Sequence, residues 1–87
     1  MSRTIYKYHI DTPDKMLRLP APEPLSVGMQ GEEMMLWAAV TPGATESEVY
    51  VKIVGTGHPC PAEPWKFLGT VFDGRYVWHV FWRMVSP

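Results

Sequence analysis

An Asp-Gly pair between two runs of strand-forming residues constrains the fold of this chain more than any other feature. Asp73-Gly74 separates residues 65–72 (WKFLGTVF) from residues 76–82 (YVWHVFW), and both runs are rich in aromatic and β-branched side chains. Such side chains favour strands, and glycine accepts the positive φ that a tight hairpin turn requires. The sequence therefore predicts a β-hairpin over residues 65–82.

The second strand of this hairpin has no clearly polar face. Side chains alternate between the two faces of a strand. One face carries Tyr76, Trp78, Val80 and Trp82, and the other carries Val77, His79, Phe81 and Arg83. We expect burial of both faces, either inside the domain or against another chain.

Alternating patterns predict further strands over much of the remaining chain. These strands are expected at residues 4–10, 16–19, 25–30, 34–40 and 48–54. The last is the most clearly amphipathic, with Val49, Val51 and Ile53 on its inward face. The strand at residues 34–40 is apolar on both faces, which is typical of a central position in a sheet.

The connections between these strands are marked by turn residues and prolines. Residues 11–14 form a turn cluster that could join the first two strands as a hairpin. Residues 20–24 (PAPEP) predict a stiff crossing loop, because proline fixes its own φ and restricts the preceding residue. Six to seven short strands without a helical repeat predict an all-β fold, either a small antiparallel β-sandwich or a partly open barrel.

Length and charge limit the classes of protein to which the chain can belong. With 87 residues it is expected to form a single domain over residues 1–87. The net charge is -1 and the Lys and Arg residues are scattered singly, which argues against direct nucleic-acid binding. No apolar run approaches the roughly 20 residues of a membrane span and no secretory segment opens the chain, so we expect a cytoplasmic protein.

The reactive side chains do not form a recognisable catalytic pattern. Cys60 is the only cysteine, so no disulfide can form within the chain. His9, His58 and His79 lack the spacing of metal ligands. No nucleophile and base stand at a spacing that indicates a catalytic pair. We expect no metal, no cofactor and no enzymatic activity.

Candidate binding residues are found instead after the amphipathic strand and in the hairpin. Gly55, Thr56, Gly57 and His58 form either a turn that leaves this strand or a nest of N–H groups for an anion. Four Trp, four Tyr and three Phe are more aromatic residues than one small core readily hides. Trp65 follows the proline-rich residues 59–64 and is the expected interface anchor, because rigid aromatic side chains supply much of the energy of protein interfaces. Lys66 and Arg75 are the accompanying cations.

Several short motifs resemble a family of small uncharacterised proteins that phages and prophages encode. The motifs are IYKY (5–8), LW (36–37), GTGHP (55–59), GTV (69–71) and VWHVF (77–81). The resemblance carries over no catalytic residue and no cofactor. It implies a phage accessory protein expressed inside a bacterial host cell, a setting in which small proteins often disable host immune effectors such as CRISPR systems.

Two functional hypotheses follow. The first is a counter-defence protein, for instance an anti-CRISPR, that inhibits a host protein by stoichiometric binding. The second is an oligomeric sponge for a small ligand such as a nucleotide, with residues 55–58 as N–H donors, Arg75 or Lys66 as the cation and Trp65 as the stacking ring. Both hypotheses are compatible with a homo-oligomer.

Overall fold

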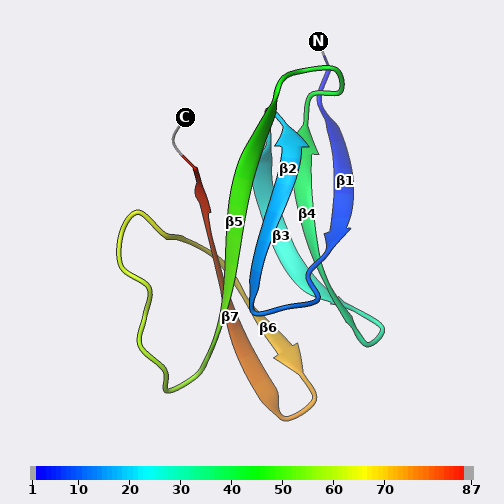
Figure 1. The fold of residues 1–87 in the computed structure, drawn as a ribbon. Coiled ribbons are helices and arrows are strands. Elements are labelled where there is room, and N and C mark those ends of the chain that lie inside the picture. Colours follow the sequence, from blue (N-terminus) through cyan, green and yellow to red (C-terminus); the bar gives the residue numbers. More distant parts are fainter. Residues whose placement is uncertain (1, 86–87) are drawn as a thin grey trace.

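Seven strands and no helix make up the described part of the chain, which is residues 2–85 of the computed structural model (Figure 1). The strands are β1 (Thr4–His9), β2 (Asp14–Pro20), β3 (Glu23–Gln30), β4 (Glu33–Val40), β5 (Glu46–Gly55), β6 (Lys66–Asp73) and β7 (Tyr76–Met84). The predicted all-β fold is therefore confirmed.

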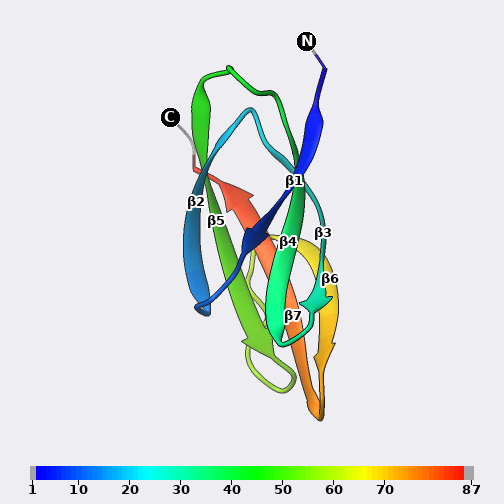
Figure 2. The ribbon, with the colours of Figure 1, turned by 90° about the vertical axis from the view of Figure 1, so that its right-hand side faces the viewer.

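The strands form two antiparallel sheets that pack face to face as a small sandwich (Figure 2). The three-stranded sheet has the order β1-β4-β3, and the four-stranded sheet has the order β2-β5-β7-β6. The two sheets do not close into a barrel. Strand β4 lies at the centre of its sheet, as its apolar sequence predicts.

The core lies between the sheets and is built from alternate residues of the central strands. Leu36 and Val40 of β4 meet Val49 and Val51 of β5 and Val80 of β7, and each of these side chains is at most 1% exposed. Val49 and Val51 confirm the predicted inward face of β5. Ile53 continues that face but is only half-buried, because it lies near the open end of the sandwich.

The β6–β7 hairpin forms at the predicted place. Asp73 pairs with Tyr76, so Gly74 and Arg75 are the two turn residues. Gly74 has a φ of 61°, which lies in the left-handed region that a glycine occupies without steric cost. The hairpin extends beyond the other strands at one end of the molecule (Figures 1 and 2).

The expected hairpin between the first two strands is wrong. Strand β1 pairs with β4, whereas β2 pairs with β5 in the other sheet. Each of the two strands has one apolar face, and placing them in separate sheets lets both faces contribute to one core. Ile10 and Leu19 are each 4% exposed as a result.

The proline-rich crossing is shorter than its sequence indicates. Only Ala21 and Pro22 lie outside the strands, because Pro20 ends β2 and Pro24 lies within β3. Strand β3 is an edge strand, and its register shifts between Pro24 and Ser26. Proline lacks the N–H donor that a central strand needs, so an edge strand with a bulge can accommodate it.

Candidate protein-binding surface

Strand β7 has one buried face and one face that no second sheet covers, although the loop at residues 56–65 contacts it at His79 and Arg83. Its inner face includes Val80, which is fully buried. On its outer face Val77, His79, Phe81 and Arg83 are all half-buried. Burial of both faces inside the domain is therefore wrong, because the three-stranded sheet covers only one side of β7. Burial of the outer face against another chain stays a prediction.

Aromatic rings gather on this uncovered outer side of the four-stranded sheet. Phe67 and Phe72 of β6 are 59% and 71% exposed, which makes them prominent apolar side chains of the surface. The Phe67 ring contacts the Phe81 ring of β7 edge to face, with centroids 5.5 Å apart. We call this surface the outer aromatic face and define it as Tyr50, Trp65, Phe67, Phe72 and Phe81.

A bulge places both phenylalanines of β6 on the same side of the sheet. Phe67 pairs with Phe81 and Gly69 pairs with Val80, so Leu68 is an extra residue in the ladder. In a regular strand, residues separated by five positions point to opposite faces. The extra residue restores the alternation for Phe72, which pairs with the outward-facing Val77.

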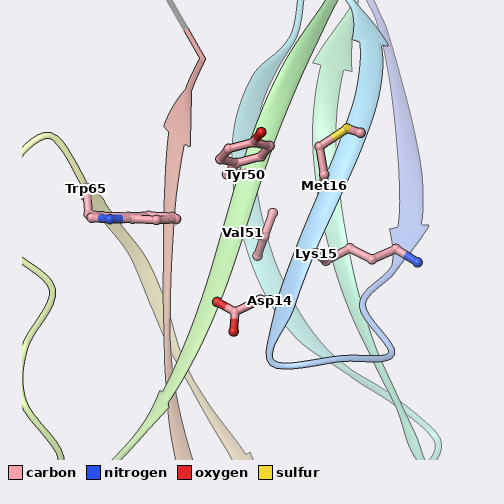
Figure 3. A pocket seen from close by; sticks show the side chains of 6 residues that line it. All are labelled: Asp14, Lys15, Met16, Tyr50, Val51 and Trp65. Atoms are coloured by element: carbon pink, nitrogen blue, oxygen red, sulfur yellow. The ribbon is translucent and has the colours of Figure 1, made fainter.

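Trp65 is part of this face but is not a free anchor. The Lys52 Nζ lies 5.2 Å from the centroid of the Trp65 ring, and the Arg83 Cζ lies 5.5 Å from it. The same guanidinium carbon lies 5.6 Å from the centroid of Tyr50. Trp65 and Tyr50 line a cavity of about 320 Å³ together with Asp14 and Met16 of β2. Figure 3 shows how these side chains lie around it.

These contacts give Trp65 a structural role as well as an exposed edge. Cation–π contacts of this kind contribute about 0.5–1 kcal/mol each at exposed sites. They attach the end of the loop at residues 56–65, which projects from the body of the sandwich, to β5 and β7 (Figure 1). A Trp65→Ala substitution would therefore change the packing of this loop as well as any interface.

Trp65 and Lys66 are neighbours in sequence but lie on opposite sides of the four-stranded sheet. Lys66 pairs with Trp82 on the inner face, and its Nζ lies 5.1 Å from the centroid of that ring. The two residues therefore do not form one anchor of a ring with an adjacent cation.

Residues 55–58 form a tight turn at the end of β5. The His58 N–H donates to the Gly55 carbonyl at 3.2 Å, and the Thr56 N–H donates to the Val77 carbonyl at 3.4 Å. Gly57 has a φ of 96°, which favours glycine. Two of the N–H groups that a nest would offer to an anion are thus used within the chain, so the geometry favours the interpretation as a turn.

Several of the predicted binding residues line a groove beside this turn. Its volume is about 440 Å³, and Gly55, Thr56, His58 and Arg75 line it together with Tyr76, Val77 and Trp78. The Tyr76 and Trp78 rings are stacked, with centroids 5.9 Å apart and an angle of 22° between their planes. Trp65 and Lys66 do not line this groove, so the structure separates the predicted residues into different surfaces.

His79 is held by hydroxyl groups on both sides of its ring. The Thr56 Oγ1 lies 2.8 Å from Nε2, and the Thr70 Oγ1 lies 3.1 Å from Nδ1. Cys60, His58 and His79 border one cavity of about 270 Å³, but both ring nitrogens of His79 already have these partners. Among residues 2–85, no group of three or more His, Cys, Asp or Glu side chains is arranged to hold a metal ion.

We expect Cys60→Ser to retain both folding and biological activity. The Cys60 side chain is exposed, and its Sγ donates a hydrogen bond to the neighbouring Pro61 carbonyl, at 3.6 Å. The check is the unfolding midpoint together with an activity assay against the target. A selective loss of activity in a folded variant would indicate that the thiol reacts, and would contradict a function by binding alone.

Comparison with known proteins places this fold in a family. A family model described as a domain of unknown function (DUF7352) matches residues 1–86. The chain belongs to the DUF7352 family. No curated protein and no solved structure gives a significant match to this DUF7352 domain. Within residues 2–85 of the domain, no helix is long and apolar enough to cross a membrane.

Proposed function

We propose that this DUF7352 protein acts by stoichiometric binding to a partner protein through the outer aromatic face. The observation that carries the proposal is the exposure of Phe67 and Phe72 on a sheet face that no second sheet covers. Large rings on a rigid sheet lose little conformational entropy on binding, and a few aromatic anchors dominate the energy of many interfaces. The neighbouring Phe81 extends the apolar surface across two strands.

The proposed biological role is that of a phage accessory protein in the cytoplasm of a bacterial host. Its partner would be a host protein, in particular an immune effector such as a CRISPR nuclease. The GTGHP and VWHVF motifs support this setting through their resemblance to phage and prophage proteins. An inhibitor of this kind needs an interface rather than a catalytic centre, which suits the side chains available on the outer aromatic face.

A titration against purified bacterial immune effectors tests this function. Each effector is assayed at increasing molar ratios of the protein, and native mass spectrometry of the mixture measures the mass of any complex. We expect one effector to lose activity with an endpoint near a fixed molar ratio. Complete loss of effector activity at a small fraction of one equivalent would indicate turnover and contradict the proposal.

A small-ligand binder is the second candidate, because the groove beside residues 55–58 has suitable chemistry. Its volume of about 440 Å³ lies in the range of ligand pockets, and it combines the exposed Arg75 with the stacked Tyr76 and Trp78 rings. Native mass spectrometry of the protein purified from cells would then show a bound small mass. Loss of that mass in Arg75→Gln would support the sponge hypothesis, and its absence from the unmodified protein would contradict it.

A further inference from the structure

Charged residues are distributed unevenly along the chain. Before residue 49 there are four Lys or Arg and seven Asp or Glu, whereas from residue 49 onward there are four Lys or Arg and two Asp or Glu. The segment from residue 49 onward, which contains most of β5 and all of β6 and β7, therefore has more cations than anions, although the net charge of the whole protein is -1.

The ion pairs follow the same division. In the described residues, the ion pairs join Arg3 to Glu23, Lys15 to Asp11 and Arg18 to Glu48. The Lys15–Asp11 hydrogen bond is 2.9 Å long and lowers the pKa of the Asp11 carboxyl group below its ordinary value. All of these contacts involve residues before position 49, so the cations of that half are largely paired.

Three of the four later cations have aromatic partners instead of carboxylates. Lys52 and Arg83 lie over the Trp65 ring, and Lys66 lies over Trp82. None of these side chains, nor Arg75, forms an ion pair within residues 2–85. A ring has no net charge, so each cation keeps its full charge and can attract an anion.

The outer side of β5 and β7 carries Lys52 and Arg83, neither of which forms an ion pair within residues 2–85. The outward residues of β5, β6 and β7 include Tyr50, Lys52, Val54, Phe67, Thr70, Phe72, Val77, His79, Phe81 and Arg83. Glu48 of β5 also points outward, but it is paired with Arg18 of β2. The nearest carboxylate in the register is Asp14 of β2, which pairs with Lys52 in the ladder but forms no ion pair with it. The surface is therefore apolar along β6, and beside Trp65 it has the two cations Lys52 and Arg83 against the single carboxylate of Asp14, which leaves a net positive charge there.

We infer that the segment which docks on the outer aromatic face is an acidic stretch of a protein, with carboxylates adjacent to apolar side chains. This inference rests on the proposed function and specifies its partner. The apolar residues of the segment would cover Phe67 and Phe81, and its carboxylates would reach Lys52 and Arg83. Complementary charges at an interface increase the association rate and select the partner.

The same observations favour an acidic protein segment over single-stranded nucleic acid. A nucleic acid carries one phosphate per nucleotide and needs a track of cations, whereas this face offers Lys52 and Arg83 at one end only. Bases also stack on open ring faces, but the Phe67 and Phe81 rings contact each other at an angle of 64°. Such an edge-to-face pair leaves less open ring surface for stacking than separate rings would.

The test uses a synthetic peptide that alternates Glu with Leu and Phe as its probe. A matched peptide with Lys in place of every Glu and a thymidine oligonucleotide are the comparisons. Backbone amide NMR of the full chain follows each titration and locates the contact. We expect the acidic peptide to shift residues 50–54, 66–72 and 77–83, with an affinity that falls as salt is added.

Charge-removing variants identify the residues responsible. The double variant Lys52→Gln/Arg83→Gln should weaken binding of the acidic peptide by about tenfold or more. Arg18→Gln also removes positive charge from the outer side of this sheet, but from a residue already paired with Glu48, and should change the affinity by less than about twofold. If the double variant does not fold, Phe67→Ser replaces an exposed ring and should weaken binding as well.

Other results would overturn the inference in distinguishable ways. Equal binding of the basic peptide, or binding of the acidic peptide that salt and the double variant leave unchanged, would show that charge does not select the partner. Tighter binding of the oligonucleotide at the same residues would assign the face to nucleic acid. If the effector titration succeeds and the acidic peptide does not bind, the proposed function stands and this inference fails; if the peptide binds and no effector is inhibited, the inference stands and the inhibitory function fails.

Discussion

Replacing Phe67 and Phe72 together by serine should weaken binding of the partner protein by about 100-fold or more, because aromatic anchors at an interface centre often contribute about 2 kcal/mol or more each. The two rings are 59% and 71% exposed, so their removal should change the thermal unfolding midpoint little. The measurement is the effector titration, accompanied by calorimetry of the variant alone.

Ile5→Ser provides the matched control for this double variant. Ile5 is 62% exposed and lies on β1 of the other sheet, opposite Ala39 in the ladder. Its replacement removes an exposed apolar side chain from a strand outside the outer aromatic face and should leave partner binding unchanged. Equal losses of binding for Ile5→Ser and the double variant would mean that the partner does not distinguish the two sheets, and would reject the outer aromatic face as the site.

Replacing Trp78 by alanine should reduce the free energy of unfolding by about 3 kcal/mol, the lower end of the range for large aromatic residues in a core. Trp78 is half-buried and packs against the core cluster from β7. Its ring lies close to Gly55, where a Cβ would approach the Trp78 Cζ3 to 3.3 Å. Chemical denaturation followed by circular dichroism measures the change.

Tyr76→Ala separates the packing of Trp78 from its stacking with Tyr76. Tyr76 is 57% exposed, so this variant should lose only the stacking contact, about 0.5–1.5 kcal/mol. A loss of less than about 1 kcal/mol for Trp78→Ala in a folded protein would show that Trp78 belongs to the groove surface rather than to the core. It would also strengthen the case for the groove as a ligand site.

Local signals were sufficient to predict the strands and one of their pairings. Asp73-Gly74 and its flanking β-formers determine the β6–β7 hairpin, because a tight turn leaves only neighbouring strands to pair. The alternation around Val49 and Val51 identifies the inner face of β5. These features depend on residues close together in sequence, which is why the sequence alone reveals them.

Pairings between distant segments could not be predicted in the same way. Strand β2 pairs with β5 and β1 pairs with β4, and no turn residue specifies these partners. The partner choice depends on how two apolar faces combine into one core, which involves the whole chain.

The candidate surface was predicted only in part, for a related reason. The sequence drew attention to Trp65 as the free anchor, whereas Lys52 and Arg83 hold that ring against the sheet. Phe67 and Phe72 were missed because their spacing of five residues places them on opposite faces of a regular strand. The available signal was the density of aromatic residues in residues 65–82, which does not by itself show the direction of each ring.

Because Leu68 is an extra residue in the ladder, the number of residues between Phe67 and Phe72 decides whether both rings point to the same side of the sheet. Residue spacing, and not only residue type, therefore determines what this protein displays to a partner. Deleting one residue between Phe67 and Phe72 would keep every aromatic side chain of β6 but would direct Phe67 or Phe72 to the other side of the sheet. A gain or loss of one codon could thus remove the surface in one step, without the gradual change that substitutions produce. Relatives that share the surface are therefore better identified by the spacing between these two phenylalanines than by overall identity along the strand.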